Sequence, residues 1–510
     1  MLAKLNSYGL IGIEGCPISV EVDISTGMQR VDTVGLPDSA VKESKERVRS
    51  AIINSGYSYP DMRLVVNLAP ADIRKEGTVY DLPIALGILA ARGSIPLHSA
   101  DDCIVIGELA LDGAVRAVTG VLPMVISAYE RGFRKVLLPA ENAEEASYFD
   151  DMSIFPVHTL NEACAHLRGI APIEPAPALV WREQKAHYAH DFSEIKGQQA
   201  AKRAAEIAVA GNHNLLMIGS PGSGKTMLAR SIPSILPELS MEESLEITRI
   251  HSVAGELRGR GGIIRERPFR APHHSASIPA LVGGGSKALP GEISLAHYGV
   301  LFMDEFPLFP SAVLEALRQP LEDGVVTITR AAAKMSYPAE FMLVAAMNPC
   351  PCGNYGSKTK ECRCTQMQID KYRNRISSPL LDRLDIHIEM NEIDYSDLTS
   401  KEKGESSASI RERVIAARRI QKERYAGEGI LFNSQLNTPL MRKYCRMEPD
   451  AEDLLHKAYD RFKLSARAYT RVIKVSRTIA DIEGGGPITK AHVSEAVQYR
   501  GLDEKYWGAR

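Results

Sequence analysis

A glycine-rich loop between an apolar run and a helical pattern constrains the fold of this 510-residue chain more than any other feature. The apolar run Asn214–Gly219 reads N-L-L-M-I-G, and the loop Gly219–Thr226 reads G-S-P-G-S-G-K-T. Glycines let the backbone curl so that successive N–H groups face a phosphate, and the N-terminus of the following helix adds positive potential. A strand, this loop and a helix in this order predict a parallel α/β sheet that binds a nucleoside triphosphate.

Two strand-like segments carry the polar residues that hydrolysis of the bound nucleotide requires. In the loop we expect Lys225 to reach the β- and γ-phosphates and Thr226 to bind Mg²⁺. The run Gly299–Met303 ends in Asp304, expected beside Mg²⁺, and Glu305, expected to orient and deprotonate water. An acidic strand end is common by itself, but together with the loop it favours hydrolysis of ATP. The expected nucleotide-binding residues are Gly219, Ser220, Pro221, Gly222, Ser223, Gly224, Lys225, Thr226 and Asp304.

A third apolar run, Phe341–Ala346, leads to Asn348. In a doubly wound sheet this places Asn348 beside the two phosphate-handling strands, near the γ-phosphate. The alternative is an asparagine that forms a turn before Pro349.

Four of the eight cysteines fall within fifteen positions. They form two C-x-C pairs separated by a turn-rich loop, an arrangement that can present four thiolates to one tetrahedral ion. The spacing is tighter than the usual C-x-x-C, so structural Zn²⁺ and unliganded or redox-active thiols both remain open. The candidate zinc ligands are Cys350, Cys352, Cys362 and Cys364.

Composition restricts the partners and the compartment. The net charge is −2 and the pI about 6.7, so no whole-molecule positive field attracts nucleic acid, and any such contact must come from a local patch. The sequence has no run of eighteen apolar residues, which argues against a membrane span, and its N-terminus has no apolar signal core. The expected location is therefore the cytoplasm.

The pattern along the chain predicts four parts. A Pro/Ala-rich stretch after residue 169 reads as a linker, because it lacks apolar periodicity. The predicted parts are a mixed α/β domain at 1–168, the linker at 169–190, the nucleotide-binding core at 191–395 with the cysteine insert 350–364, and a helical lid at 396–510.

Three blocks, at 191–198, 290–305 and 348–353, resemble the magnesium-chelatase-like ATPases of the AAA+ class, and within them the bacterial ComM/YifB family. The likeness spans nearly the whole chain. It implies an AAA+ P-loop core with a C-terminal helical lid, preceded by a Lon-protease-like α/β domain. It also implies a ring-shaped, hexameric ATPase, a helicase for branch migration of incoming DNA in naturally competent bacteria. In this likeness Asn348 resembles the sensor-1 residue.

The resemblance also assigns arginines to the ATPase cycle. Arg383 matches the arginine finger, which neutralises charge on the transferring phosphoryl group in a neighbouring subunit. Its alternative is a surface arginine paired with Asp382 or Asp385. Arg467 resembles sensor 2, and Arg471, one turn further on, is the competing assignment.

The N-terminal domain resembles the proteolytic domain of Lon-type proteases, but two positions depart from that pattern. Val79 stands where such a protease carries its serine, and Leu122 where it carries its lysine. A valine offers no nucleophile and a leucine no base, so this dyad cannot hydrolyse peptides. The domain is expected to serve binding or assembly.

DNA contacts are expected in two segments. Glu256–Arg270 carries five arginines against two glutamates, and a hairpin is expected over 325–337. Inserts at both places project toward the ring channel in this AAA+ branch; the alternative is a solvated charge cluster. The candidate DNA contacts are Arg258, Arg260, Arg265, Arg330 and Lys334.

Two functions remain in competition. The first is an ATP-driven motor, a homo-oligomer acting on single-stranded or branched DNA. The second is a magnesium-chelatase-type ATPase that remodels a partner protein or inserts metal. A metal-ion-adhesion domain normally accompanies that second activity, and the sequence contains no corresponding extra domain.

Overall fold

The computed structural model describes residues 1–181, 188–257, 262–285, 288–329, 334–357, 359–392 and 404–508. The chain forms two compact units, each with its own hydrophobic core. The sequence pattern places Met241–Ile264 in the nucleotide-binding core, whereas the structure groups this segment with the N-terminal unit. The first unit comprises Met1–Glu183 and Met241–Ile264, and the second Gln184–Ser240 and Arg265–Arg510.

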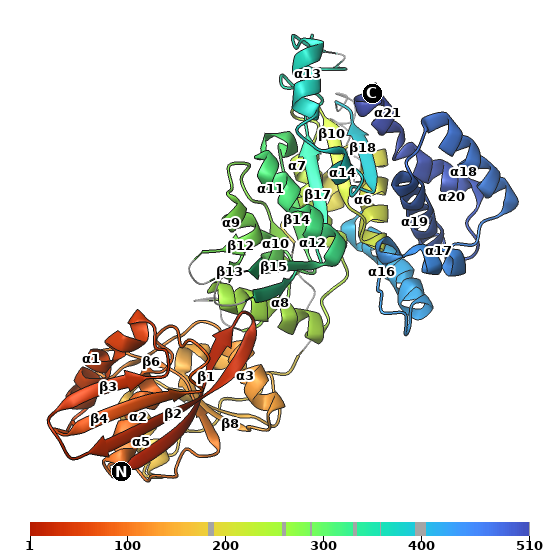
Figure 1. Ribbon diagram of the computed structural model, residues 1–510. Coiled ribbons are helices and arrows are strands. Elements are labelled where there is room, and N and C mark those ends of the chain that lie inside the picture. Colours follow the sequence, from red (N-terminus) through yellow and green to blue (C-terminus); the bar gives the residue numbers. More distant parts are fainter. Residues whose placement is uncertain are drawn as a thin grey trace. The chain divides into compact units, whose positions relative to one another are not determined.

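A mixed seven-stranded sheet is the centre of the described part of the first unit (Figure 1). The order is β3 (Arg30–Val34), β4 (Arg63–Ala69), β2 (Glu14–Ser25), β1 (Leu2–Ile11), β5 (Cys103–Val105), β8 (Lys135–Pro139) and β9 (Ser153–Val157). β2 is antiparallel to both its neighbours, and the other adjacent pairs are parallel. In β2 buried residues alternate with more exposed ones because successive side chains point to opposite faces.

Helices cover the sheet of the first unit. Every residue of α2 is buried, and this helix packs against β1 and β2. The helix α1 begins after Asp38, whose side chain accepts a hydrogen bond from the Val41 N–H at 2.8 Å. The helices are α1 (Ser39–Asn54), α2 (Asp81–Ala91), α3 (Val121–Glu130), α4 (Ala143–Ala146), α5 (Leu160–Leu167) and α8 (Met241–Ala254), and the short strands β6 (Glu108–Leu109) and β7 (Val115–Arg116) pair beside them.

The helix α8 is bound to the N-terminal unit by apolar and polar contacts. It packs against α3, with Ile247 and Ile250 fully buried. Ser252 Oγ donates to the carboxylate of Glu145 at 3.2 Å, and the Arg249 guanidinium donates to the backbone of the β1–β2 turn at 3.3 Å. An insertion in the nucleotide-binding sequence is thereby part of the other unit.

A parallel five-stranded sheet forms the centre of the second unit, as the sequence predicts (Figure 1). The strand order is β11 (Phe269–Arg270), β14 (Val300–Met303), β17 (Met342–Met347), β10 (Leu215–Gly219) and β18 (Ile386–Met390). All residues of β10, β14 and β17 are buried, which is typical of parallel strands covered on both faces.

Helices and hairpins surround this sheet. The expected hairpin over 325–337 is present as β15 (Val325–Thr329) and β16 (Lys334–Pro338), which pair antiparallel. The other elements are α6 (Gln199–Gly211), α7 (Lys225–Ser231), α9 (Ile278–Val282), β12 (Gly283–Gly284), β13 (Leu289–Pro290), α10 (Glu292–Leu295), α11 (Ser311–Ala316), α12 (Arg318–Asp323), α13 (Gln366–Arg373) and α14 (Ser378–Leu381).

The C-terminal part of the second unit is helical. Its helices are α16 (Ser407–Arg424), α17 (Thr438–Tyr444), α18 (Pro449–Phe462), α19 (Ala466–Ile482), α20 (Lys490–Gln498) and α21 (Gly501–Trp507). Throughout the described ranges, no helix is both long and apolar enough to cross a lipid bilayer.

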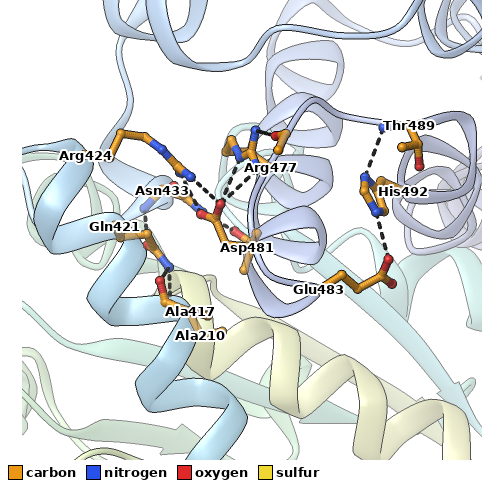
Figure 2. Close-up of polar contacts among 12 residues, drawn as sticks. Ala210, Ala417, Gln421, Arg424, Asn433, Arg477, Asp481, Glu483, Thr489 and His492 are labelled. Carbon is orange, nitrogen blue, oxygen red and sulfur yellow. Dashed lines mark hydrogen bonds and ion pairs between the residues drawn. The ribbon is translucent and has the colours of Figure 1, made fainter.

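A buried carboxylate joins two of these helices, α16 and α19. Asp481 on α19 accepts hydrogen bonds from Arg424 on α16 at 2.7 Å, from Arg477 at 3.1 Å and from Asn433 at 2.9 Å (Figure 2). The side chain of Gln421 extends the network by donating to a backbone carbonyl of α6 at 3.0 Å. One carboxylate is shared by two guanidinium groups inside the helical part, and the hydrogen bond of Gln421 connects this network to the parallel-sheet core.

Candidate nucleotide-binding site

The central strands of the parallel sheet bring the predicted site residues together at their carboxyl ends. Met303 pairs with Ala345 across β14 and β17, and Ile218 pairs with Met347 across β17 and β10. The residues that follow these strands therefore lie at one edge of the sheet, where open α/β sheets bind ligands.

The loop after β10 has the backbone that its glycines allow. Gly222 and Gly224 have φ angles of +84° and +91°, in the left-handed region that side chains disfavour. A Cβ added at Gly219 would lie 2.5 Å from the Met390 carbonyl oxygen of β18, so this position requires glycine as well. The loop therefore curls tightly between β10 and α7.

Lys225 links this loop to Asn348. Its buried ammonium donates to the carbonyls of Gly219 at 2.7 Å and Ser220 at 2.9 Å, and to Asn348 Oδ1 at 3.2 Å. Burial lowers the pKa of Lys225, and the nearby Asp304 opposes that shift. The side chains of Lys225 and Asn348 thus meet at one point, next to the loop backbone.

Thr226 and the acidic pair form the adjacent part of the site. Thr226 Oγ1 donates to Asp304 Oδ2 at 2.9 Å, and the Glu305 N–H donates to Asp304 Oδ1 at 2.9 Å. A hydroxyl and a carboxylate at this separation suit one Mg²⁺ with bound phosphate oxygens. Glu305 has a φ of +51°, and its side chain is 48% exposed.

His274 is a site residue that sequence reasoning missed. Its Nδ1 lies 3.2 Å from Glu305 Oε2, and its ring is 4.1 Å from that of His273. His274 follows β11, the strand next to β14, so the same sheet edge brings the two side chains together. The one sequence feature that could have pointed to His274 is the adjacent pair His273–His274, and this pair fits no nucleotide-binding motif.

Arg383 lies on the segment after α14 and is largely buried. Its guanidinium pairs with Glu322 and donates to the Pro379 carbonyl at 2.8 Å. The ion-pair alternatives considered from the sequence were Asp382 and Asp385, and the partner in the structure is instead Glu322.

The two sensor-2 candidates on α19 differ in their surroundings. Arg471 forms an ion pair with Asp385. Although burial acts in the opposite direction, Arg471 and His213 hold the pKa of Asp385 well below its usual range. Arg467, one turn earlier, is exposed, and its side chain has no hydrogen-bond or ion-pair partner among the residues that the structure describes. Arg467 is thus the candidate with a guanidinium available to a ligand.

The four cysteines come together as their spacing predicts. Their Sγ atoms all lie within 4.8 Å of one another, and Cys350 is 3.4 Å from Cys352 and 3.7 Å from Cys362. A tetrahedral ion with Zn–S bonds of about 2.3 Å requires sulfur atoms roughly 3.8 Å apart. The donor set and its spacing fit Zn²⁺, with each thiol offering one ligand atom.

The expected DNA contacts are only partly described. Arg258, Arg260 and Arg330 lie outside the described residues, whereas Arg265 is half-buried and Lys334 is exposed at the start of β16. Two other arginines of the same arginine-rich segment have internal roles. The side chain of Arg267 donates to three backbone carbonyls, and that of Arg270 donates to Glu292 at 2.6 Å.

In the N-terminal unit the two positions compared with a Lon-type dyad are apolar and buried. Val79 is 6% exposed, and Leu122 on α3 is fully buried. Neither position carries a group that attacks or protonates a peptide bond.

Comparison with known proteins extends over nearly the whole chain. The family described as magnesium chelatase, subunit ChlI, matches residues 191–398, the family subunit ChlI of Mg-chelatase matches 20–142, and the C-terminal family of that subunit matches 404–500. A segment of 159 residues, 30% of this chain, is 26% identical to Lon protease 2 of Bacillus subtilis and covers 28% of that protease.

Several relatives align over nearly their whole length, among them YifB and ComM. YifB of Escherichia coli is 44% identical over 506 residues, covering 98% of this chain and 97% of YifB. The competence protein ComM of Haemophilus influenzae is 44% identical over 507 residues, covering 98% of both chains. With the parallel sheet and its glycine-rich loop, these matches identify the chain as a member of the ComM/YifB family of magnesium-chelatase-like AAA+ ATPases.

Proposed function

We propose that this chain is an ATP-hydrolysing ring motor on DNA, a helicase that promotes branch migration during recombination of incoming DNA in natural transformation. The observation that carries the proposal is the 44% identity to the competence protein ComM over 98% of both chains. The motor is a cytoplasmic homo-hexamer that uses ATP and Mg²⁺ and binds single-stranded or branched DNA.

Each nucleotide site uses the residues at the sheet edge. Lys225 binds the β- and γ-phosphates, and Thr226 and Asp304 hold Mg²⁺. Glu305 orients and deprotonates the attacking water. The 3.2 Å pair with His274 supports a cycle in which the glutamate alternates between this partner and the water.

Arginines complete the site in the ring. Arg383 enters the site of the neighbouring subunit, where its charge stabilises the phosphoryl group in transfer. Its ion pair with Glu322 must therefore break when subunits assemble with ATP. Arg467 reports the state of the γ-phosphate in its own subunit, and its exposure favours it over Arg471.

In this motor DNA passes along basic side chains. A metal ion holds the segment 350–353, called the cysteine turn below. The proposed DNA contacts are Arg258, Arg260, Arg265, Arg330 and Lys334. Their contacts to phosphate are independent of sequence and weaken as salt rises. Zn²⁺ bound by Cys350, Cys352, Cys362 and Cys364 would have a structural role, because four thiolates leave no open position for a substrate.

The test is DNA-stimulated hydrolysis. At low salt, branched and single-stranded DNA should raise the ATPase rate of the wild-type chain, and the stimulation should decline as salt is added. The Lys225→Ala variant gives the background rate. An ATPase rate that branched DNA leaves unchanged at low salt would contradict the DNA motor.

The second candidate is a magnesium-chelatase-type ATPase that remodels a partner protein. The three magnesium-chelatase family matches favour it. In that case a metal-inserting partner of the porphyrin pathway, rather than DNA, would stimulate hydrolysis in the same assay.

A further inference from the structure

The cysteine turn lies directly against the glycine-rich loop. Gly353, which follows Cys352, has a φ of +80°. A Cβ added at Gly353 would lie 2.6 Å from Pro221 Cδ and 2.8 Å from Pro221 Cγ. The backbone of the turn therefore packs against Pro221 with no room for a side chain at Gly353. Pro221 belongs to the loop that is expected to bind phosphate.

A second connection to the same site runs through the backbone. Cys350 follows Asn348 by two residues, and Asn348 Oδ1 accepts a hydrogen bond from Lys225 at 3.2 Å. A displacement of the turn would thus move both Pro221 and the partner of the Lys225 ammonium.

On its other side the turn rests on an aromatic and cationic stack. Arg373 donates from Nε to the Pro349 carbonyl at 3.1 Å, and its guanidinium lies 4.8 Å from the ring of Tyr355 and 4.6 Å from that of Tyr506. The Tyr355 N–H donates to Cys350 Sγ at 3.4 Å. Cation–π contacts of this kind stabilise a planar guanidinium between two rings. The first C-x-C pair is therefore held between this stack and the loop.

The second C-x-C pair restrains the turn through its sulfur atoms. Cys362 Sγ lies 3.7 Å from both Cys350 Sγ and Cys352 Sγ. Cys364 is followed by Thr365, the N-cap of α13, and this helix ends in the stacked Arg373. A metal bound by all four thiolates would therefore tie the turn to the start of α13.

We propose that metal binding at the four cysteines positions the glycine-rich loop, so that the metal content sets the affinity for ATP. The proposal rests on the nucleotide and zinc sites of the proposed function. It assigns the cysteine turn a positioning role: Gly353 presses on Pro221, and the bound metal keeps Gly353 in place.

The experiment compares two full-length variants with the wild-type chain. The double variant Cys362→Ser/Cys364→Ser removes the two ligands furthest along the chain from the loop, and Cys16→Ser removes a cysteine of the N-terminal unit. Zinc per chain is measured by elemental analysis, and the Kd of a fluorescent ATP analogue by titration. We expect the double variant to lose zinc and to bind the analogue about tenfold more weakly. Tenfold in Kd corresponds to about 1.4 kcal/mol, close to the loss of one hydrogen bond to a charged group. Cys16→Ser should match the wild-type chain in both measurements.

A reversible measurement separates positioning from misfolding. Removing zinc from the wild-type chain with a thiol reagent and a chelator should lower its affinity for the nucleotide analogue. Reducing the thiols and adding zinc back should restore that affinity. A zinc-free chain that binds the analogue as tightly as the loaded chain would overturn the inference, as would a wild-type chain purified without zinc that binds it tightly. A zinc-loaded wild-type chain that binds no nucleotide would instead refute the proposed function, and this inference with it.

Discussion

Replacing Glu145 by glutamine should strengthen the attachment of α8 to the N-terminal unit at alkaline pH. Glu145 is 6% exposed and accepts hydrogen bonds from Asn142 at 2.8 Å and from Ser252 of α8 at 3.2 Å. Burial raises the pKa of Glu145 to about 7, although both hydrogen bonds favour the charged form. Near pH 8 the folded protein therefore holds a carboxylate in surroundings that disfavour its charge.

The direction of the pH effect follows from proton binding. A glutamate in the unfolded chain titrates near 4.3, so between about pH 4.3 and 7 only the folded state holds this proton. The contribution of Glu145 to stability is fully present below that interval and is lost as pH rises through it. At about 1.4 kcal/mol per pH unit, the loss over this interval of about 2.7 units is about 4 kcal/mol. A glutamine keeps both hydrogen-bond partners and escapes this loss.

Hydrogen exchange of α8 measures the effect. At pH 8.5, peptides from Met241–Ala254 should exchange more slowly in Glu145→Gln than in the wild-type chain, by up to the factor that corresponds to about 4 kcal/mol. At pH 4.5 the difference should largely disappear. Glu144→Gln is the matched control, because Glu144 is the exposed neighbour. Equal exchange of the Glu145→Gln and wild-type chains at pH 8.5 would refute the reasoning.

Three further changes address the candidate nucleotide site and the helical C-terminal part. Glu305→Gln should bind ATP yet hydrolyse it about 10²–10⁴-fold more slowly in single-turnover assays, and normal turnover would rule out the general base. Mixing Arg383→Ala with Lys225→Ala chains, each inactive alone, should restore hydrolysis at hybrid interfaces, and no restoration would count against a finger acting between subunits. Asp481→Asn removes the carboxylate partner of the buried Arg477 and the half-buried Arg424, and should destabilise the helical part by about 3–5 kcal/mol in denaturant unfolding. A change below about 1 kcal/mol would contradict a stabilising network.

The arrangement of side chains in the candidate nucleotide site was predictable because its information is local. The strand before Gly219, the glycines after it and the acidic end at Asp304 each occupy one short stretch of sequence. The rule that parallel strands end at a common edge then brings Asn348 to them without knowledge of any side-chain contact. The cysteine cluster is similar, since the nine residues between Cys352 and Cys362 limit how far its two pairs can separate.

Other features depend on tertiary contacts that no short pattern records. The partner of Arg383 is Glu322, 61 positions away, although two acidic residues lie within two positions of it in the sequence. His274 meets Glu305 only because β11 lies next to β14 in the sheet. The apolar face of α8 indicates that this helix packs against something, but it does not indicate which unit supplies the surface.

The placement of α8 has a consequence for producing the second unit as a separate fragment. A fragment that begins after residue 183 still encodes Met241–Ile264, yet lacks the surface on which that helix is buried. Such a fragment would expose Ile247 and Ile250 to water, and exposed apolar side chains of this kind promote aggregation. A soluble ATPase fragment therefore needs a short polar linker between Ser240 and Arg265 in place of residues 241–264. In chimeras of two relatives, α8 must come from the same parent as the N-terminal unit.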